Sequence, residues 1–259
     1  MFKDKNVVLT GAAEGVGRSI ALAFARAGAN LILADHQHQG GTVDGIEAAV
    51  GRKPPCILCD IQNEQQVIAM GSQVREISGG KVHVLVNNAG FNGMAQLVEN
   101  MPLEAWNKTI GTNLTGTMLV VRELIPLLRA ARGAAIVNVA SNVAKRGIPY
   151  RADYCCSKWA MLGLTQTQTL ALELARDDIR VNAVCPGPIE GERVEQLLEM
   201  HSRIEQRPLE EMRRDWMNVP MGRFIHPGEV AGAILFLAGK GSSAMTGQAL
   251  NVTGGFIMN

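Results

Sequence analysis

The 259-residue sequence lacks any strong excess of charge and any long apolar run. Its formal net charge is +1 and it contains no basic block, so its bulk electrostatics do not favour a nucleic-acid or anionic membrane partner. No apolar run reaches the roughly 18 residues that a membrane-spanning helix needs. The first residues, Met1 to Lys5, lead into an apolar run without the layout of a signal peptide. We therefore expect a soluble, cytoplasmic protein.

Cysteine is also scarce, and the five cysteines do not form a disulfide framework in a chain of this size. Cys56 and Cys59 have redox or metal-ligand spacing, but no second ligand pair completes a zinc site. A short buried strand is the simpler interpretation of the segment that contains them. Cys155 and Cys156 follow Tyr154 directly and are interpreted as helix-packing residues. We predict no metal site.

Hydrophobic residues make up 47% of the chain, which is enough for a well-buried core in a single domain over residues 1–259. Strand-like apolar runs alternate with helical patterns, without a linker or an internal repeat. This alternation predicts an α/β fold with a doubly wound, parallel, seven-stranded sheet and helices on both faces, in three layers (α/β/α). The expected strands are residues 7–10, 30–34, 56–59, 82–86, 134–140, 179–185 and 248–252.

A glycine-rich turn joins the first expected strand to the first expected helix, and it reads Gly11-Ala12-Ala13-Glu14-Gly15-Val16-Gly17. Glycines permit a tight turn and let backbone amides approach a pyrophosphate. The N-terminus of the following helix adds a positive partial charge. The strand–turn–helix context therefore predicts a phosphate-binding site.

The second expected strand ends in Asp35. An acidic residue at this place can accept hydrogen bonds from the adenosine ribose, and its charge repels a 2′-phosphate. Glu14 adds to that repulsion, and neither Lys nor Arg occurs between Asp35 and Gly51. These residues favour NAD over NADP. Because His36 and His38 follow Asp35, NADP is kept as the less favoured alternative.

The stretch from Ser141 to Lys158 combines groups suited to proton transfer. Ser141 follows an expected strand, whereas Tyr154 and Lys158 lie in a helical pattern over residues 154–175. Positions four apart share one helix face, so the Lys158 ammonium can lie near the Tyr154 phenol. A free phenol, with a pKa near ~10, is a poor base at neutral pH, and a nearby cation favours the phenolate. Taken alone, this spacing is also common in ordinary helix packing.

Asn113 lies among the apolar positions of a long helical region, residues 103–132. A buried Asn must satisfy the hydrogen bonds of its amide or it reduces stability. Two interpretations stay open: a polar contact that holds helices together, or a place where the helix opens to hold a water. The periodicity does not choose between them.

Together these motifs resemble the short-chain dehydrogenase/reductase family, in the group with chains of about this length. The resemblance covers essentially the whole chain and implies a Rossmann fold with NAD(P)-dependent alcohol dehydrogenase or ketone reductase activity. Its five separated signatures are Thr10-Gly11-x-x-x-Gly15-x-Gly17, Asn87-Asn88-Ala89-Gly90, Ser141, Tyr154-x-x-x-Lys158 and Pro186-Gly187.

The resemblance implies roles for the matching residues. Tyr154 would be the general base in oxidation and the general acid in reduction, with Ser141 bonded to the reacting oxygen. Lys158 would hold the nicotinamide ribose and favour the phenolate, and Asn113 would anchor a water that relays protons. Asp60 and Ile61 would flank the adenine, and Ile189 would meet the nicotinamide carboxamide. The implied cofactor-binding residues are Gly11, Glu14, Gly15, Val16, Gly17, Asp35, Asp60, Ile61, Asn87, Ala89, Gly90, Tyr154, Lys158, Pro186, Gly187 and Ile189.

One position departs from the family pattern. The family often has Pro-Gly-x-x-x-Thr, with the Thr hydroxyl near the cofactor. Here the run is Pro186-Gly187-Pro188-Ile189-Glu190-Gly191, so Gly191 takes the place of the Thr and that hydroxyl contact is absent.

Two arginines in the loop before Tyr154 suggest the substrate class. Arg146 and Arg151 could bind a carboxylate bidentately, or they could be surface or subunit-contact charges. Residues 189–216 correspond to the family's substrate lid. With Trp159 and the Pro-Gly-Pro run, they resemble members that act on polyols, sugars and sugar acids. We expect NAD to oxidise a secondary alcohol in a small polyhydroxylated, acidic substrate, with candidate contacts at Ser141, Arg146, Arg151 and Tyr154.

Two alternatives remain. A 3-oxoacyl reductase of the fatty-acid type would run in the reducing direction, usually with NADP, which Asp35 disfavours. A non-catalytic dinucleotide-binding regulator would not need the intact set of Ser141, Tyr154, Lys158 and Asn113. The family is commonly tetrameric, so a homotetramer is expected. The apolar tail, residues 255–259, and the apolar face of residues 230–237 fit subunit contacts.

Overall fold

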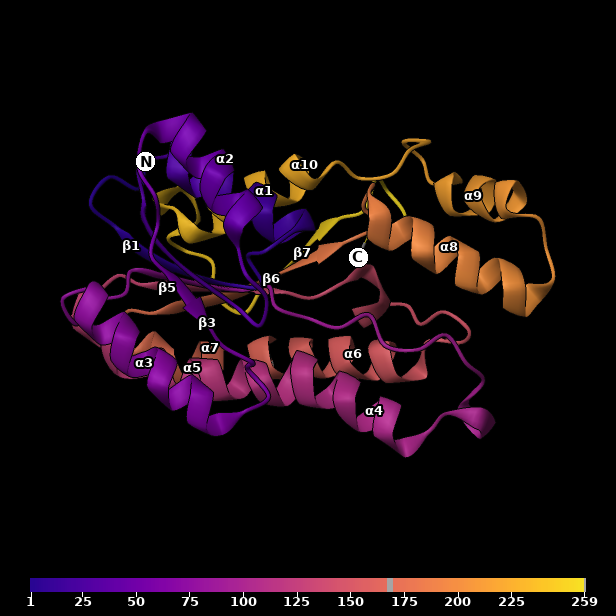
Figure 1. Ribbon diagram of the computed structural model, residues 1–259, viewed down its shortest axis with the longest axis horizontal. Helices are drawn as coiled ribbons and strands as arrows, with labels where there is room; N and C mark the ends of the chain where they lie inside the picture. Colours follow the sequence, from indigo (N-terminus) through magenta and orange to yellow (C-terminus); the bar gives the residue numbers. More distant parts are fainter. Residues whose placement is uncertain (167–169, 259) are drawn as a thin grey trace.

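The computed structural model describes residues 1–166 and 170–258, and Figure 1 shows their arrangement. Seven parallel strands form a sheet in the order β3-β2-β1-β4-β5-β6-β7. The strand order reverses between β1 and β4, which makes their carboxyl ends a topological switch point. The strands are β1 Asn6–Thr10, β2 Asn30–Asp35, β3 Cys56–Leu58, β4 Val84–Asn87, β5 Ala135–Val139, β6 Arg180–Pro186 and β7 Ala249–Val252.

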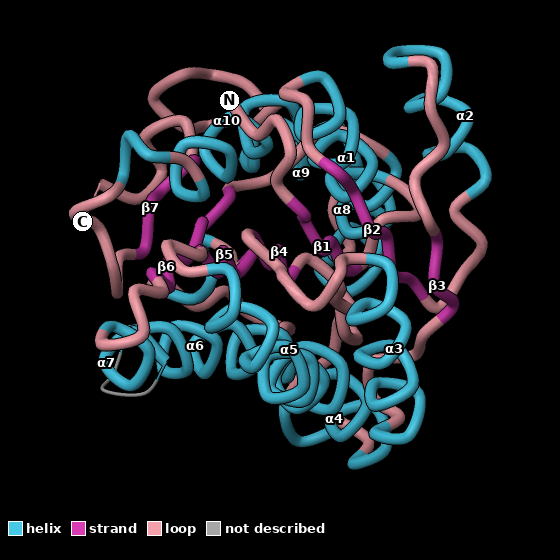
Figure 2. Tube along the Cα trace, turned by 90° about the vertical axis from the view of Figure 1, so that its left-hand side faces the viewer, coloured by secondary structure: helices cyan, strands magenta, loops and turns pink. Residues whose placement is uncertain are grey.

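Helices cover both faces of this sheet, which confirms the predicted three-layer α/β fold (Figure 2). Side chains alternate between the faces of β1: Val8 packs in one apolar cluster, Val7 and Leu9 in the other. One layer holds α1 (Gly15–Arg26), α2 (Gly40–Val50) and α10 (Pro227–Ala238). The opposite layer holds α3 (Glu64–Ile77), α4 (Leu103–Ile110), α5 (Thr117–Ala131), α6 (Ala152–Gln166) and α7 (Leu170–Ala175).

The long helical region expected over residues 103–132 is interrupted. A π-helical turn, Gly111–Gly116, separates α4 from α5, and Asn113 lies inside it. The helix expected over residues 154–175 appears as α6 and α7. Residues 167–169 of that expectation lie outside the described residues.

Two helices lie beside the carboxyl edge of the sheet, apart from the two helix layers (Figure 1). They are α8 (Glu192–Glu205) and α9 (Leu209–Met217), and they fall in the region from which the sequence predicts a substrate lid. Val194, Leu198 and Met212 form a small apolar cluster between them. The two helices therefore pack mainly on each other.

The apolar face of α10 is used inside this chain. Val230, Ile234 and Leu237 are fully buried in the cluster that also contains residues of α1, so they are not available for the subunit contacts that the sequence suggests. Phe236 on the same helix is 44% exposed and Met258 of the tail is 80% exposed. Of the helices that the structure describes, none combines the length and apolarity needed to cross a bilayer.

Candidate active site

The glycine turn is held closely against the switch point. A β-carbon on Gly17 would lie 1.8 Å from the Gly11 carbonyl oxygen, so only glycine lets α1 start this near the turn. Asn88 fixes the turn from the next strand: its Nδ2 donates to the Gly11 carbonyl at 2.7 Å, and its backbone N–H donates to Thr10 Oγ1 at 3.2 Å. The sequence analysis gave Asn88 no role of its own, although its position at the end of the strand beside the turn is a usable signal.

Asp35 is the last residue of β2 and stands beside this turn. Its carboxylate is 7% exposed, and it accepts hydrogen bonds from the backbone N–H groups of Ala13 at 2.9 Å and Gln37 at 3.0 Å. His36 Nδ1 lies 3.1 Å from the same carboxylate. A carboxylate has about four lone-pair sites. Asp35 therefore retains acceptor capacity for ribose hydroxyls.

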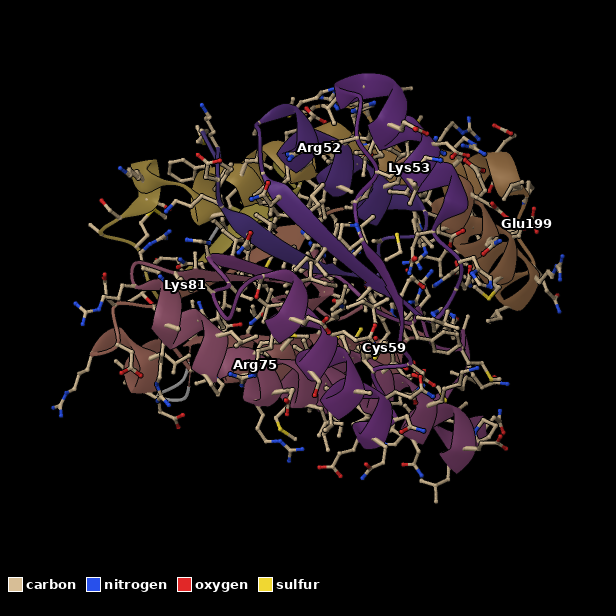
Figure 3. The ribbon with its side chains drawn as sticks, turned by 60° about the vertical axis from the view of Figure 1, so that its left-hand side comes forward. Arg52, Lys53, Cys59, Arg75, Lys81 and Glu199 are labelled. Carbon is tan, nitrogen blue, oxygen red and sulfur yellow. The ribbon has the colours of Figure 1, made fainter. Side chains whose placement is uncertain are left out.

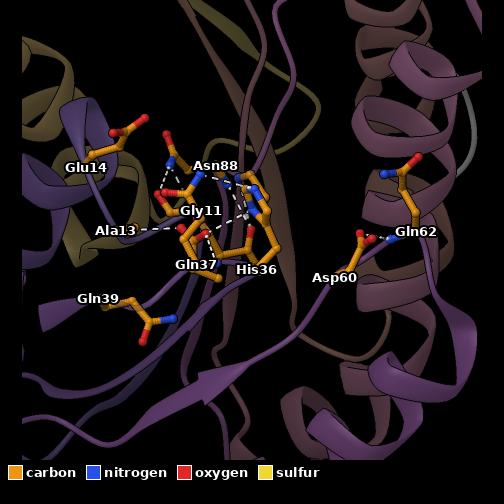
Figure 4. A network of polar contacts seen from close by, with 12 residues as sticks. Gly11, Ala13, Glu14, His36, Gln37, Gln39, Asp60, Gln62 and Asn88 are labelled. Atoms are coloured by element: carbon orange, nitrogen blue, oxygen red, sulfur yellow. Dashed lines mark hydrogen bonds and ion pairs between the residues drawn. The ribbon is translucent and has the colours of Figure 1, made fainter. Parts of the chain in front are cut away.

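Asp60 and Ile61 follow β3, which neighbours β2, and Figure 4 shows Asp60 and Gln62 across from Ala13, His36 and Gln37. Asp60 Oδ1 accepts from the Gln62 backbone N–H at 3.0 Å. Ile61 packs on the π-helical turn, since a β-carbon on Gly116 would lie 2.7 Å from its side chain. The structure thus places the expected adenine-flanking residues along the same edge of the sheet.

Asn113 joins the loop after β4 to α6. Its Oδ1 accepts from the Phe91 backbone N–H at 2.7 Å, and its Nδ2 donates to the Phe91 carbonyl and to Ser157 Oγ, each at 2.9 Å. The side chain therefore makes the polar contact that the sequence offered as one interpretation. The other interpretation, an opened helix, fits the π-helical turn, because such turns are frequent at functional sites.

Tyr154 and Lys158 lie one turn apart on α6, with the Lys158 ammonium 5.7 Å from the Tyr154 ring centroid. Lys158 is buried, and its Nζ donates to the Val139 carbonyl at 2.8 Å. Burial lowers the pKa of Lys158, the Tyr154 charge opposes that change, and the Arg193 charge adds to it. Gly90 separates the two polar groups: a β-carbon there would lie 3.3 Å from Asn113 Oδ1 and 3.6 Å from Lys158 Nζ.

Ser141 lies two residues beyond β5 and begins a short 3₁₀ turn. Its Oγ accepts from the Val143 backbone N–H at 3.3 Å and donates to Asn142 Oδ1 at 3.0 Å. The side chain is 8% exposed. These contacts fix the hydroxyl at the carboxyl end of β5, the edge at which the other candidate residues also lie.

Arg146 and Arg151 lie on different aromatic rings. The Arg146 guanidinium is 5.2 Å from the ring of Phe256, in a groove formed with the C-terminal tail. Arg151 is 2% exposed, lies 4.7 Å from the Tyr154 ring centroid, and donates to the Asn92 carbonyl. Burial lowers the pKa of Arg151, while the Tyr154 and Asp153 charges oppose that change. Of the two, Arg151 is the one in contact with Tyr154.

The segment after β6 explains the departure at Gly191. Pro186 is the last residue of β6, Gly187 donates to the Val252 carbonyl at 2.9 Å, and Ile189 pairs with Ile225. Gly191 is the N-cap residue before α8 and has φ +133°, a conformation that is essentially restricted to glycine. A Thr would be strained there, so the glycine follows from the backbone path. Just beyond it, Arg193 lies 3.9 Å from Glu14, linking α8 to the glycine turn.

The cysteines show no sign of a site. Among the described residues, no group of His, Cys, Asp and Glu could hold a metal ion, and all five cysteines are free thiols. Cys59 is buried next to β3 (Figure 3), and burial together with the Asp60 charge raises its pKa to about 11. A thiol of this kind is a poor nucleophile.

A glycine turn at the switch point of a doubly wound parallel sheet defines the dinucleotide-binding α/β proteins. A family model described as enoyl-(acyl carrier protein) reductase matches residues 11–257. The chain belongs to the short-chain dehydrogenase/reductase family, whose members bind a nicotinamide dinucleotide and act as oxidoreductases on alcohols or ketones. The close cradle at Gly17 and the acceptor capacity of Asp35 fit such a cofactor.

The curated relatives span two substrate classes. The chain is 36% identical to a 3-oxoacyl-[acyl-carrier-protein] reductase of Thermotoga maritima, with 99% of each chain covered. It is 34% identical to galactitol 2-dehydrogenase of Agrobacterium fabrum, with 98% of each chain covered.

The solved structures that resemble this chain also fall into two classes of enzyme. An NAD⁺-bound xylitol dehydrogenase superposes with a TM-score of 0.90 at 30% identity, covering 98% of this chain and 99% of its own. An actinorhodin polyketide ketoreductase with NADPH superposes with a TM-score of 0.90 at 35% identity, covering 98% of each chain. The relatives therefore support oxidoreductase chemistry and do not distinguish NAD from NADP.

Proposed function

We propose that the protein is an NAD-dependent oxidoreductase that interconverts a secondary alcohol and a ketone by hydride transfer. Its substrate class is a small polyhydroxylated molecule, such as a sugar acid, a sugar or a polyol. The observation that carries the proposal is the half-buried Tyr154 with two cations near its ring: Lys158 Nζ lies 5.7 Å and Arg151 Cζ 4.7 Å from the ring centroid.

Proton transfer falls to the chain's own residues. Tyr154 takes the proton from the substrate hydroxyl as the alcohol becomes a ketone, and Ser141 donates a hydrogen bond to the reacting oxygen. Lys158 stabilises the phenolate by its charge, and Asn113 and the π-helical turn hold the route by which the proton leaves. A bound NAD would supply the acceptor for the hydride that the substrate carbon gives up.

Asp35 and Glu14 support the choice of NAD. Asp35 is nearly buried beside the glycine turn, and Glu14, which is 63% exposed, stands at the start of α1. Both carboxylates would face the ribose end of the cofactor, where a 2′-phosphate would meet two like charges.

A 3-oxoacyl reductase is the second candidate, and the 36% identity to the Thermotoga maritima enzyme favours it. The surroundings of Tyr154 favour the first candidate. A guanidinium buried beside the reacting group suits a polar, acidic substrate better than an apolar acyl chain. We also propose that residues 189–216 form the substrate lid, because this segment brings α8 to the carboxyl edge of the sheet.

Steady-state assays of the purified protein would test this function. We expect NAD-linked oxidation of at least one member of a panel of aldonates, alditols and aldoses, and at most weak NADPH-linked reduction of a 3-oxoacyl thioester.

The Asp35→Ala variant should narrow the preference for NAD over NADP, expressed as the ratio of kcat/KM values. Thioester reduction with NADPH as the dominant activity would replace this proposal with the second candidate.

A further inference from the structure

Two polar atoms, one in the loop before α6 and one on α8, are buried and have no hydrogen-bond partner among the described residues. They are Nε of Arg151 and Nε2 of His201. Their side chains are 2% and 3% exposed. Because buried polar groups are nearly always hydrogen-bonded, two unpartnered groups, one of them on the side chain that contacts Tyr154, call for an explanation.

Arg151 is placed by an unusual backbone conformation. Tyr150 has φ +63°, which is rare for a bulky residue and tends to persist where function requires it. Its carbonyl accepts from the Gln96 N–H at 2.8 Å, and Gln96 also pairs with Arg151 as an isolated bridge. The loop before α6 is thus clamped so that the Arg151 guanidinium lies on Tyr154 and its Nη2 bonds the Asn92 carbonyl.

His201 approaches the same loop from α8. Its ring makes edge contacts with Tyr150, at 5.8 Å between centroids, and with Trp216 of α9, at 5.2 Å. Burial lowers the pKa of His201, the nearby Glu205 raises it, and the Arg151 charge lowers it, so the two side chains lie within electrostatic reach. The sequence carries no signal for His201, because nothing in it links α8 to the loop before Tyr154.

The protonation state of His201 decides which of its ring nitrogens can accept a hydrogen bond. Burial lowers the pKa of His201 from its ordinary value, which favours the neutral imidazole. Glu205 Oε1 lies 3.6 Å from Nδ1 and favours the tautomer with its proton there. Nε2 then carries a lone pair and accepts a hydrogen bond, while Nε of Arg151 donates one.

We propose that Arg151 and His201 form one subsite for an α-hydroxy carboxylate, in which Arg151 binds the carboxylate and His201 accepts from the neighbouring hydroxyl. This inference rests on the proposed function and narrows its substrate class to sugar acids. A neutral polyol supplies the hydroxyl without the charge, and an acyl thioester supplies neither group. Arg146, which lies on Phe256, is not part of this subsite.

Binding of aldonates to the enzyme–NADH complex, measured through the fluorescence of NADH, tests the subsite without turnover. The ligands are glycerate, xylonate and gluconate, with glucitol as the neutral counterpart of gluconate. We expect Arg151→Gln to weaken binding of the preferred aldonate roughly 10–100-fold, as loss of a charge-assisted hydrogen bond implies, and to change glucitol binding much less. Arg151→Lys should recover part of the loss.

His201 variants separate a hydrogen bond from packing. His201→Gln keeps a polar group near the Nε2 position, and His201→Leu does not, so Gln should retain aldonate affinity that Leu loses. Arg203→Gln, on the exposed side of the same helix, is the matched control and should bind like the wild type. Equal losses for His201→Leu and His201→Gln, or equal losses of gluconate and glucitol in Arg151→Gln, would assign these residues to packing and overturn the subsite.

The same measurement separates the two proposals. If wild-type enzyme–NADH binds none of the three aldonates, the subsite is wrong, whatever alcohol the enzyme oxidises. If it binds an aldonate with the expected dependence on Arg151 but oxidises none of the panel, the subsite stands and the proposed reaction fails.

Discussion

Tyr154 lies where three stretches of the chain meet: α6 itself, the loop that carries Asn92, and the end of β5. Arg151 precedes it by three positions and Lys158 follows it by four, so both cations come from the same helical neighbourhood. The anchors of those cations come from elsewhere, since Lys158 bonds Val139 and Arg151 bonds Asn92. The phenol is thus fixed by local spacing, and its surroundings by tertiary contacts.

Replacing Tyr154 by Phe removes the hydroxyl and keeps the ring that supports Arg151. We expect kcat to fall roughly 100–10,000-fold, the usual contribution of general acid–base catalysis. The dissociation constant of NADH, measured by fluorescence titration, should change little. Turnover within tenfold of the wild type would contradict the assignment of Tyr154 as the acid–base group.

At the residue scale, the sequence predicts what helix geometry dictates and little beyond it. The spacing of Tyr154 and Lys158 has one structural outcome once α6 forms. Arg146 and Arg151 lie in a loop whose path depends on the positive φ of Tyr150, so the sequence could not tell which one reaches Tyr154. His201 is supplied by a separate helix and leaves no local pattern to read.

At the scale of elements, α10 shows how a helix end is built from side chains. His226 is the N-cap and its Nδ1 accepts from the Gly228 N–H at 3.0 Å, while Glu229 Oε2 accepts from the His226 N–H at 2.8 Å. Arg223 holds the Glu229 carboxylate at 2.8 and 2.7 Å. The Arg223 hydrogen bond, followed by that of the His226 N–H, lowers the pKa of Glu229 to about 2.

Glu229→Gln should therefore destabilise the fold in a pH-dependent way. The folded-state pKa lies below the ordinary 4.5, so the carboxylate's contribution is complete above pH 4.5 and is lost as the pH falls towards about 2. In urea unfolding, the difference between wild type and variant should be constant from pH 7 to 5 and should shrink below pH 4.5. A difference that grows on acidification would refute this account.

A matched control for that experiment is Glu199→Gln. Glu199 projects from α8 (Figure 3) and makes an exposed ion pair with Arg203 at 3.7 Å, outside any helix cap. We expect its effect on the free energy of unfolding to be small, as for exposed ion pairs in general.

Element boundaries show the same limit of sequence reasoning. The cap of α3 can be predicted from the sequence, because Asn63 is a strong N-cap residue; its Oδ1 accepts from the Gln66 N–H at 3.1 Å. The cap of α10 is not predicted, since His is not among the usual N-cap residues. His226 caps the helix here because its side chain accepts from the Gly228 N–H while Glu229 accepts from the His226 N–H. The π-helical turn likewise carries no periodicity signal of its own.

At the scale of the molecule, the alternation of strand and helix was sufficient to predict the doubly wound sheet. A buried parallel strand reads as a continuous apolar run, as Val84-Leu85-Val86 does. Subunit contacts are harder to predict from the sequence, because an apolar helix face can pack on the core of its own chain or on a partner subunit. In α10 the core takes that face and leaves Phe236 outward.

We propose a homotetramer, with the exposed Phe236 and Met258 among its contacts. Light scattering should then give four times the 27.8 kDa chain mass. Phe236→Asp should lower that mass, whereas Ile77→Asp on α3, a residue with the same 44% exposure, should leave it unchanged. A monomer at micromolar concentration would rule out the tetramer.

The π-helical turn also restricts which insertions and deletions the chain can tolerate. In the turn Gly111–Gly116 the hydrogen bonds join residues five apart instead of four apart, so the turn holds one residue more than an α-helical turn would. Losing one residue there would restore a regular helix and leave Val120, Leu124 and Leu127 of α5 buried against the sheet. A single-residue deletion at this place would therefore spare the core and remove the turn that positions Asn113, whereas the same deletion within α5 would rotate its apolar face by about 100°.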